Sequence, residues 1–179
     1  MLGDSLTAGY GLAPEEAFPA QLQARLKTLG IDAEIVNAGV SGDTTAGGLA
    51  RLDWALADKP DYVLVELGAN DALRGLEPAA AKDHLDKIVA GIIAKDAKPV
   101  LLGMIALGYW GREYGTAFNA IYPELAAKYR VPLYPFFLEG VAQDPALNQE
   151  DGLHPNAKGV ARIVGRIAPF LERVLKDGA

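Results

Sequence analysis

Hydrophobic positions along the chain follow two alternating patterns, one typical of helices and the other of buried strands. Segments in which apolar residues recur at every third or fourth position predict amphipathic helices, and short apolar runs between them predict strands. The five helices predicted in this way span 18–29, 49–56, 85–93, 118–129 and 160–174. The four predicted strands span 33–37, 62–67, 100–104 and 133–136.

This alternation predicts an α/β fold of three layers, a mostly parallel sheet with helices on both of its faces. The chain has 179 residues, which fits one domain, so we expect a single domain over residues 1–179. Pro132 and Pro135 lie at the last predicted strand. Because proline cannot donate a ladder hydrogen bond, this strand is expected at a sheet edge. The flavodoxin-like order 2-1-3-4-5 for five strands fits these features.

The first strand of this predicted sheet has the least sequence available to it. In the order 2-1-3-4-5 the first strand is central, yet only Met1 and Leu2 precede the segment "GDSLT" that should follow it. Its loss would leave the second and third strands without a shared neighbour. We therefore expect that the first strand is truncated and that the gene encodes further apolar residues before Leu2.

Composition and charge exclude several classes of protein. The chain lacks cysteine, which excludes disulfides, thiolate zinc sites and cysteine nucleophiles. Its net charge of -6 argues against nucleic acid as a partner, since polyanions are bound by clustered basic residues. No apolar run approaches the ~20 residues that span a bilayer, and no signal peptide stands at the start. The sequence therefore predicts a soluble protein without a membrane span, and no feature of it indicates an oligomeric state.

Four loops at the expected carboxyl ends of the strands hold residues that suit acyl transfer. Ligands of doubly wound sheets bind at this edge, and the loops read "GDSL", "GVSGD", "GAND" and "DGLH". A serine becomes a nucleophile when a histidine held by a carboxylate takes its proton. Ser5 is therefore a candidate nucleophile and His154 its candidate base, with Asp151 three residues before the histidine. His84 is interpreted as part of a solvated helix face.

Each of these residues also has a simpler explanation. Asp151 and His154 could cap the last helix, and Ser5 could bind a phosphate at the first helix, as in a flavodoxin-like module. The backbone N–H groups of Ser5 and Gly42 and the side-chain amide of Asn70 are candidate oxyanion donors. Gly42 equally suits a turn, and Asn70 equally suits a loop in which it satisfies backbone groups.

Taken together, the four motifs resemble the SGNH branch of the GDSL hydrolases. Ser5, Gly42, Asn70 and His154 stand in the family's order within "GDSLT", "NAGVSGDTT", "GAND" and "DGLHP". The similarity covers nearly the whole chain. The stretches "LVELGANDALRG", "AIYPELA" and "VPLYPFF" look most like the bacterial subgroup known as acyl-CoA thioesterase I, lysophospholipase or arylesterase. The Gly-x-Ser-x-Gly elbow of α/β-hydrolases is missing.

The resemblance implies an enzyme of broad specificity that hydrolyses carboxylic esters and thioesters through an acyl-enzyme. It implies Ser5 as nucleophile, His154 as general base and Asp151 as the residue that orients this base. It also implies an oxyanion hole formed by Ser5, Gly42 and Asn70, and neither a metal nor an organic cofactor. Members of the family often carry a signal peptide, so the resemblance suggests a periplasmic or secreted parent protein. Two alternatives are a carbohydrate acetylesterase on the same scaffold and a non-catalytic binding module.

The loop after the fourth strand departs from the pattern of this family. Relatives tend to have a turn containing proline and asparagine there, whereas this chain has Leu107, Tyr109 and Trp110. We expect the two rings to crowd the acyl end of a cleft beside Leu73, Leu76 and Leu107, which predicts a preference for short acyl or aryl esters. The alternative is that Trp110 packs into the core, or lies flat along the groove and lengthens it.

Glu66 interrupts the otherwise apolar strand at 62–67. A carboxyl group buried in such a strand needs hydrogen-bond partners or a raised pKa. We interpret Glu66 as structural. The functional alternative is that Glu66 holds the Ser5 loop through backbone N–H groups, and this alternative requires the side chain to be buried.

Overall fold

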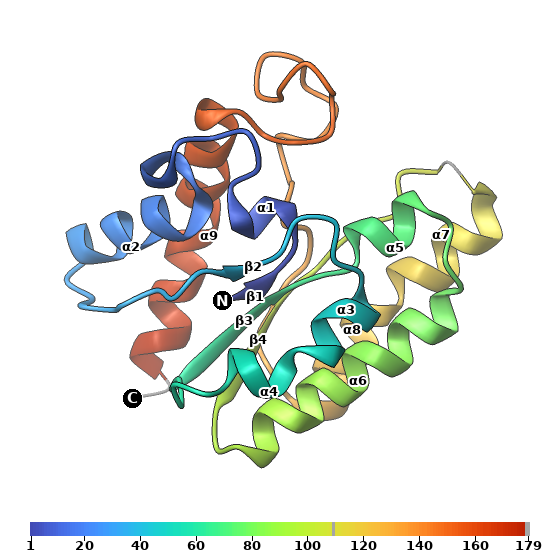
Figure 1. Ribbon diagram of the computed structural model, residues 1–179, viewed down its shortest axis with the longest axis horizontal. Helices are drawn as coiled ribbons and strands as arrows, with labels where there is room; N and C mark the ends of the chain where they lie inside the picture. Colours follow the sequence, from blue (N-terminus) through green and yellow to red (C-terminus); the bar gives the residue numbers. More distant parts are fainter. Residues whose placement is uncertain (109, 178–179) are drawn as a thin grey trace.

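The computed structural model describes residues 1–108 and 110–177 and contains one parallel sheet (Figure 1). Its strands run in the order β2-β1-β3-β4-β5, and every neighbouring pair is parallel. This confirms the predicted order and the edge position of the last strand. The strands are β1 (Leu2–Gly3), β2 (Ala38–Gly39), β3 (Tyr62–Glu66), β4 (Lys98–Leu102) and β5 (Leu133–Tyr134).

Helices cover both faces of this sheet, as Figure 1 shows. The helices are α1 (Ser5–Ala8), a 3₁₀ turn (Pro14–Glu16), α2 (Phe18–Thr28), α3 (Thr45–Ala50), α4 (Leu52–Ala55), α5 (Ala69–Leu73), α6 (Pro78–Ala94), α7 (Gly111–Asn119), α8 (Ile121–Tyr129) and α9 (Ala157–Asp177). Helix α2 packs along α9 on one face, and α3 and α8 pack against α6 on the other. Within the described ranges no helix has the length and apolar character needed to cross a membrane.

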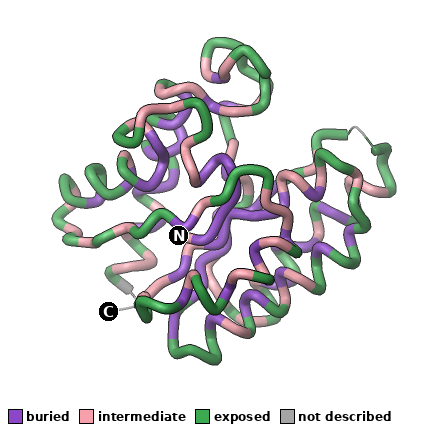
Figure 2. Tube along the Cα trace, in the orientation of Figure 1, coloured by how far each residue is buried: buried purple, intermediate pink, exposed green. Residues whose placement is uncertain are grey.

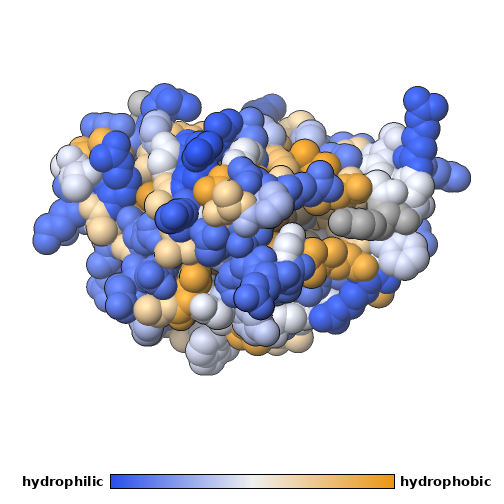
Figure 3. All heavy atoms as spheres, turned by 90° about the horizontal axis from the view of Figure 1, so that it is seen from above, coloured by the Kyte–Doolittle hydropathy of each residue, from blue (hydrophilic) through white to orange (hydrophobic). Residues whose placement is uncertain are grey.

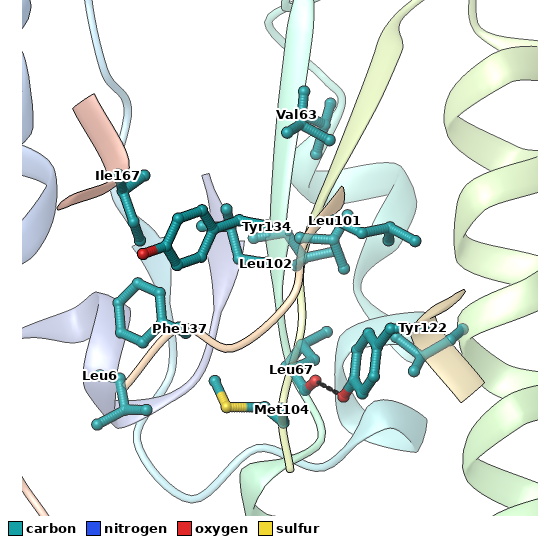
Figure 4. Packing of buried hydrophobic residues seen from close by; sticks show 14 of the residues in the cluster. Leu6, Val63, Leu67, Leu101, Leu102, Met104, Tyr122, Tyr134, Phe137 and Ile167 are labelled. Carbon is teal, nitrogen blue, oxygen red and sulfur yellow. Dashed lines mark hydrogen bonds between the residues drawn. The ribbon is translucent and has the colours of Figure 1, made fainter. Parts of the chain in front are cut away.

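Buried residues are concentrated along the strands of the sheet and on parts of the helices that flank it (Figure 2). On one side Phe137 and Ile167 pack against the strands, and on the other Tyr122 does so (Figure 4). The Tyr122 hydroxyl donates a hydrogen bond of 2.6 Å to the carbonyl oxygen of Leu67, which satisfies a polar group inside this core. Such a two-sided core explains why β3 and β4 are apolar over nearly their whole length.

Strand β1 is present and central, although it has only two residues. Leu2 and Gly3 pair with Ala38–Gly39 on one side and with Val65 and Glu66 on the other. Over these two residues β1 is therefore the shared neighbour of β2 and β3. The pairing delivers the chain directly into α1, so the short strand still fixes where the "GDSLT" segment begins.

The strand predicted at 33–37 is displaced to β2 at 38–39. Residues 31–37 have no regular structure, because a ladder forms only where a partner strand runs alongside, and β1 offers partners at two positions. The strand predicted at 133–136 ends at Tyr134, where Pro135 lacks the N–H needed to continue. The strand predicted at 100–104 lies two residues earlier, at 98–102.

Two predicted helices are each divided in two. The segment 49–56 breaks at Arg51, whose backbone (φ -109°, ψ 13°) leaves the helical range between α3 and α4. The segment 118–129 breaks at Ala120, between α7 and α8. Pro123 has no N–H to donate to the carbonyl of Asn119, so the second break follows from its sequence.

Candidate active site

Ser5 is the first residue of α1, immediately beyond the carboxyl end of the central strand β1. Asp4 caps this helix, because its Oδ1 accepts a hydrogen bond of 2.9 Å from the N–H of Leu6. Gly9 ends the helix in the left-handed conformation, with φ of 84°. The serine therefore sits on a single capped turn at the edge of the sheet where doubly wound folds bind ligands.

His154 and Asp151 reach this serine from the loop before α9. The Nε2 atom of His154 lies 2.9 Å from Ser5 Oγ, and Nδ1 lies 2.6 Å from Asp151 Oδ2. The carboxylate, the imidazole and the hydroxyl thus form a chain of two hydrogen bonds, which is the geometry of a serine–histidine–acid triad. The sequence spacing predicts the Asp151–His154 contact. The fold brings Ser5, which is 149 residues away in the sequence, within hydrogen-bond distance of His154.

Asp151 is bonded to the loop as well as to the imidazole. Its Oδ1 accepts hydrogen bonds from the N–H of Leu153 at 2.9 Å and of His154 at 3.0 Å. Partial burial raises the pKa of Asp151, but these backbone bonds and the imidazole outweigh it and lower the pKa to about 2. The carboxylate is therefore ionised at any pH near neutrality, as an orienting group must be.

Two further residues support the imidazole and were not predicted. The ring of Tyr10 packs against the ring of His154, with centroids 4.5 Å apart. Gln149 joins the two loops, because its Nε2 donates to the carbonyls of Tyr10 at 2.7 Å and Pro155 at 3.0 Å. "GYG" directly after "GDSLTA" was the available signal for Tyr10, but its contact with the histidine depends on the fold.

The three candidate oxyanion donors differ in how they are held. The N–H of Ser5 lies at the start of α1, where no preceding turn accepts it. Gly42 is at an exposed turn with φ of 83°, and within the described part of the chain its N–H has no hydrogen-bond partner. Asn70 Nδ2 donates to Asp4 Oδ2 at 3.1 Å and to the carbonyl of Asp43 at 2.9 Å. Its amide is therefore fixed by neighbouring groups in this structure.

Arg51 ties the loop after β2 to the strand that carries Ser5. Its Nε bonds Asp43 at 2.6 Å, and its two terminal nitrogens donate to the carbonyls of Ala38 at 2.7 Å and Gly3 at 2.8 Å. Arg51 is also the residue at which the predicted helix breaks between α3 and α4. The guanidinium thereby joins the ends of β1 and β2 to the loop whose carbonyl holds Asn70.

Comparison with known proteins decides the family. Residues 1–162 match the sequence profile of the GDSL-like lipase/acylhydrolase family. The chain belongs to this family. Esterase TesA of Pseudomonas aeruginosa is 42% identical over 176 residues, which are 98% of this chain and 88% of that protein. The thioesterase 1/protease 1/lysophospholipase L1 of Escherichia coli strain K12 is 45% identical over 157 residues, which are 87% of this chain and 74% of that protein.

Solved structures of GDSL hydrolases agree with the fold. The psychrotrophic esterase EstA from Pseudoalteromonas, in a structure inhibited by monoethylphosphonate, superposes with a TM-score of 0.92 at 33% identity. That match covers 98% of this chain and 96% of the other. The resemblance to SGNH hydrolases inferred from four short motifs is therefore confirmed over nearly the whole length.

In this GDSL family member a cavity of about 200 Å³ opens beside the candidate triad, lined mainly by apolar side chains. Figure 3 looks onto this edge of the molecule, where apolar side chains gather toward α5 and α7. Of the predicted substrate-binding residues, Leu73, Leu107 and Trp110 line the cavity. Leu76, which lies beyond the end of α5 at Leu73, does not line it. Tyr109 lies outside the described residues.

Trp110 is fixed at the outer wall of this cavity. It is 53% exposed, which excludes the alternative that it packs into the core. Its Nε1 donates a hydrogen bond of 2.8 Å to the carbonyl of Ala72, and its indole lies against Gly75. A Cβ atom at Gly75 would come within 2.6 Å of the indole, so the close approach needs glycine there.

The sequence analysis missed several other apolar residues that line the cavity. They are Met104, Ile105, Phe136, Leu138 and Leu153. The first four of these follow the ends of β4 and β5, and the last lies between the candidate acid and base. Their position just beyond the carboxyl ends of strands was a usable signal, but a short apolar run does not reveal which of its side chains faces a ligand.

The interpretation of His84 as part of a solvated face is wrong. The side chain is half-buried, and its Nδ1 lies 3.1 Å from Thr45 Oγ1. The same hydroxyl donates to Asp71 Oδ1 at 2.6 Å. These contacts join α3, α5 and α6 beside Asn70, far in sequence from the candidate triad. Among the described residues no cluster of three or more His, Cys, Asp or Glu side chains could hold a metal ion.

Proposed function

We propose that this chain is a serine hydrolase that cleaves carboxylic esters and thioesters through an acyl-enzyme on Ser5. The observation that carries the proposal is the pair of hydrogen bonds from Ser5 through His154 to Asp151. It is supported by relatives named esterase, thioesterase and lysophospholipase. The whole chain, residues 1–179, is proposed to act as one catalytic domain that needs no metal or organic cofactor.

In the proposed reaction, His154 takes the proton of Ser5 as Oγ attacks the acyl carbon. The charge that develops on the acyl oxygen is stabilised by the N–H groups of Ser5 and Gly42 and by the Asn70 amide. The imidazolium then gives its proton to the leaving alcohol or thiol. Water attacks the acyl-enzyme in the same way, with His154 as base, and the acid product leaves while Ser5 regains its proton.

Asn70 can serve this step only by sharing an N–H that is already in use. Both hydrogens of its amide point toward acceptors, the Asp4 carboxylate and the Asp43 carbonyl. The Asp4 bond is the longer of the two, at 3.1 Å against 2.9 Å. We therefore infer that the N–H facing Asp4 is shared between Asp4 Oδ2 and the oxyanion as the oxyanion forms.

The proposed substrates have a short acyl or aryl group. The cavity of about 200 Å³ is smaller than the ~300–1,000 Å³ of clefts that enclose drug-sized ligands. Its lining is largely apolar, which suits an acyl chain better than a sugar and so disfavours the carbohydrate acetylesterase alternative. Hydrolysis of acetyl-xylan that is faster than hydrolysis of butyryl esters would reverse this choice.

A p-nitrophenyl alkylphosphonate tests the proposal directly. Ser5 Oγ should displace one equivalent of p-nitrophenol, and mass spectrometry should find the phosphonyl group on the peptide that contains Ser5. The chain has one other serine, Ser41, which serves as the internal control and should stay unmodified. A failure to label, or labelling at another residue, would contradict the proposed nucleophile and favour the non-catalytic binding module.

Replacing Trp110 by alanine is expected to move the optimum toward longer acyl chains. Loss of the indole opens the wall that it forms against α5. Each additional methylene that then reaches an apolar surface gains ~0.8 kcal/mol, or about fourfold in kcat/KM. A series of p-nitrophenyl esters of increasing length measures the shift. Trp54, which is exposed on α4, provides the control, and Trp54→Ala should leave the optimum in place. An optimum that stays or shortens in Trp110→Ala would refute the blocking role.

A further inference from the structure

Two fully buried carboxyl groups lie directly beneath the turn that carries Ser5. Glu66 ends β3 and Asp4 follows β1, and neither side chain has any exposed surface. Glu66 Oε2 accepts hydrogen bonds from Thr7 Oγ1 at 2.7 Å and from the N–H of Asp4 at 3.3 Å. Glu66 therefore contacts the chain on both sides of Ser5 but does not reach the candidate triad itself.

The second oxygen of Glu66 has no hydrogen-bond partner among the residues described. An ionised carboxylate would leave a charged oxygen unpaired in the core, and it would stand beside a second carboxylate, so both effects oppose ionisation. Burial first, and then the charge of Asp4, raise the pKa of Glu66 well above its usual value. A carboxylic acid that keeps its proton satisfies the same two donors without this cost.

The contact between Glu66 and the turn is closely fitted. A Cβ atom at Gly3 would lie 2.0 Å from Thr7 Oγ1 and 2.7 Å from Glu66 Oε2, so a side chain at position 3 would separate them. Glycine is therefore required where β1 passes the two hydrogen-bonding groups. Such a fit fixes Asp4 and Thr7 relative to β3, which is the middle strand of the sheet.

Asp4 in turn positions two of the proposed oxyanion donors, the N–H of Ser5 and the amide of Asn70. Its Oδ1 caps the turn at Leu6, which sets the direction of the Ser5 N–H, and its Oδ2 accepts from Asn70 Nδ2. The carboxylate of Asp4 can hold both only if Glu66, which packs against its backbone, adds no second negative charge. Mutual repulsion of two buried anions would otherwise displace the turn.

We propose that Glu66 is a positioning residue, held as a neutral carboxylic acid, which fixes the Asp4–Ser5 turn and, through Asp4, the Asn70 amide. This inference rests on the proposed function. Glu66 touches neither the substrate nor the reacting atoms. It acts by keeping the donors where the charge of the transition state develops, and its accepting oxygen, not a negative charge, is what the site requires.

Kinetics of two variants at position 66 separate the accepting oxygen from the charge. Glu66→Gln keeps an accepting oxygen without charge, so kcat should stay within about threefold of the parent. Glu66→Met keeps the length but leaves Thr7 and the Asp4 N–H without an acceptor. Its kcat should fall by about 30- to 100-fold with KM within about twofold, since displaced donors weaken only the transition state. The exposed Glu34 is the matched control, and Glu34→Gln and Glu34→Met should change neither constant.

Infrared spectroscopy tests the neutral state without any turnover. At a mildly alkaline pH the parent should show the C=O stretching band of a protonated carboxyl group, which Glu66→Gln loses and Glu34→Gln keeps. Absence of that difference overturns the inference even if Glu66→Met fails to fold. Loss of activity in Glu66→Gln, or full kcat in folded Glu66→Met, overturns it as well. If phosphonate fails to label Ser5, the proposed function fails, whereas the infrared result is unaffected.

Discussion

Ser5→Ala is expected to lower kcat for a short p-nitrophenyl ester by about 10⁶-fold, the scale at which removal of a triad serine acts in a serine hydrolase. The substitution removes the hydroxyl that lies 2.9 Å from His154 Nε2, so no acyl-enzyme can form there. Any residual turnover would result from substrate binding and from stabilisation of the transition state by the oxyanion donors. The measurement is kcat at saturating ester, with circular dichroism to show that the variant is folded.

Ser41→Ala is the matched control for this experiment. Ser41 is exposed in the loop after β2 and is the other serine of the chain. Its hydroxyl is not part of the candidate triad, so kcat should stay within about threefold. A loss in Ser5→Ala smaller than about 10³-fold would show that another group starts the reaction.

Asp151→Asn is expected to lower kcat by about 10³- to 10⁴-fold and to leave KM within about threefold. An asparagine oxygen can still accept from the N–H groups of Leu153 and His154, so the loop should keep its shape. Its amide would face Nδ1 of the imidazole as a donor. The imidazole would then carry its proton on Nε2 and could not accept the proton of Ser5.

The matched control for this substitution is Asp144→Asn. Asp144 is exposed and makes the same kind of local turn, since its Oδ1 accepts from the N–H of Ala146 at 2.9 Å, but it has no imidazole partner. Its kcat should be unchanged. A loss below about tenfold in Asp151→Asn would rule out the triad.

The pH dependence of the parent enzyme follows from the same geometry. The pKa of Asp151 is lowered to about 2, so this carboxylate stays ionised throughout the range in which the protein is assayed. Only a neutral imidazole can take the Ser5 proton, so kcat/KM should be lower in acid than near neutrality. A profile that is flat from about pH 5 to 8 would contradict this role.

Elements with strong apolar periodicity could be predicted from the sequence because their burial is local. Leu22 and Leu26 recur at helical spacing in α2, and Val63 and Val65 alternate within β3, so each element shows its buried face in its own residues. Pro132 and Pro135 likewise favoured an edge position for the last strand, because neither residue can donate a ladder hydrogen bond. The apolar patterns continue across the breaks at Arg51 and Ala120, so periodicity alone reveals neither break. Pro123 was a signal for the second break, but the sequence holds no such signal for the first.

The candidate site divides in the same way. By itself the sequence determined the residue types and the Asp151–His154 pair, because three residues of loop are enough to bring a carboxylate to an imidazole. Only the tertiary structure decided that Ser5 meets this pair, that Asn70 is held by Asp4, and that Glu66 is fully buried. The residues in contact are far apart in the sequence: 149 residues separate Ser5 from His154, 66 separate Asp4 from Asn70, and 62 separate Asp4 from Glu66. These contacts depend on the order of the strands and on which side chains are buried against the sheet. Neither property can be predicted from a local sequence pattern.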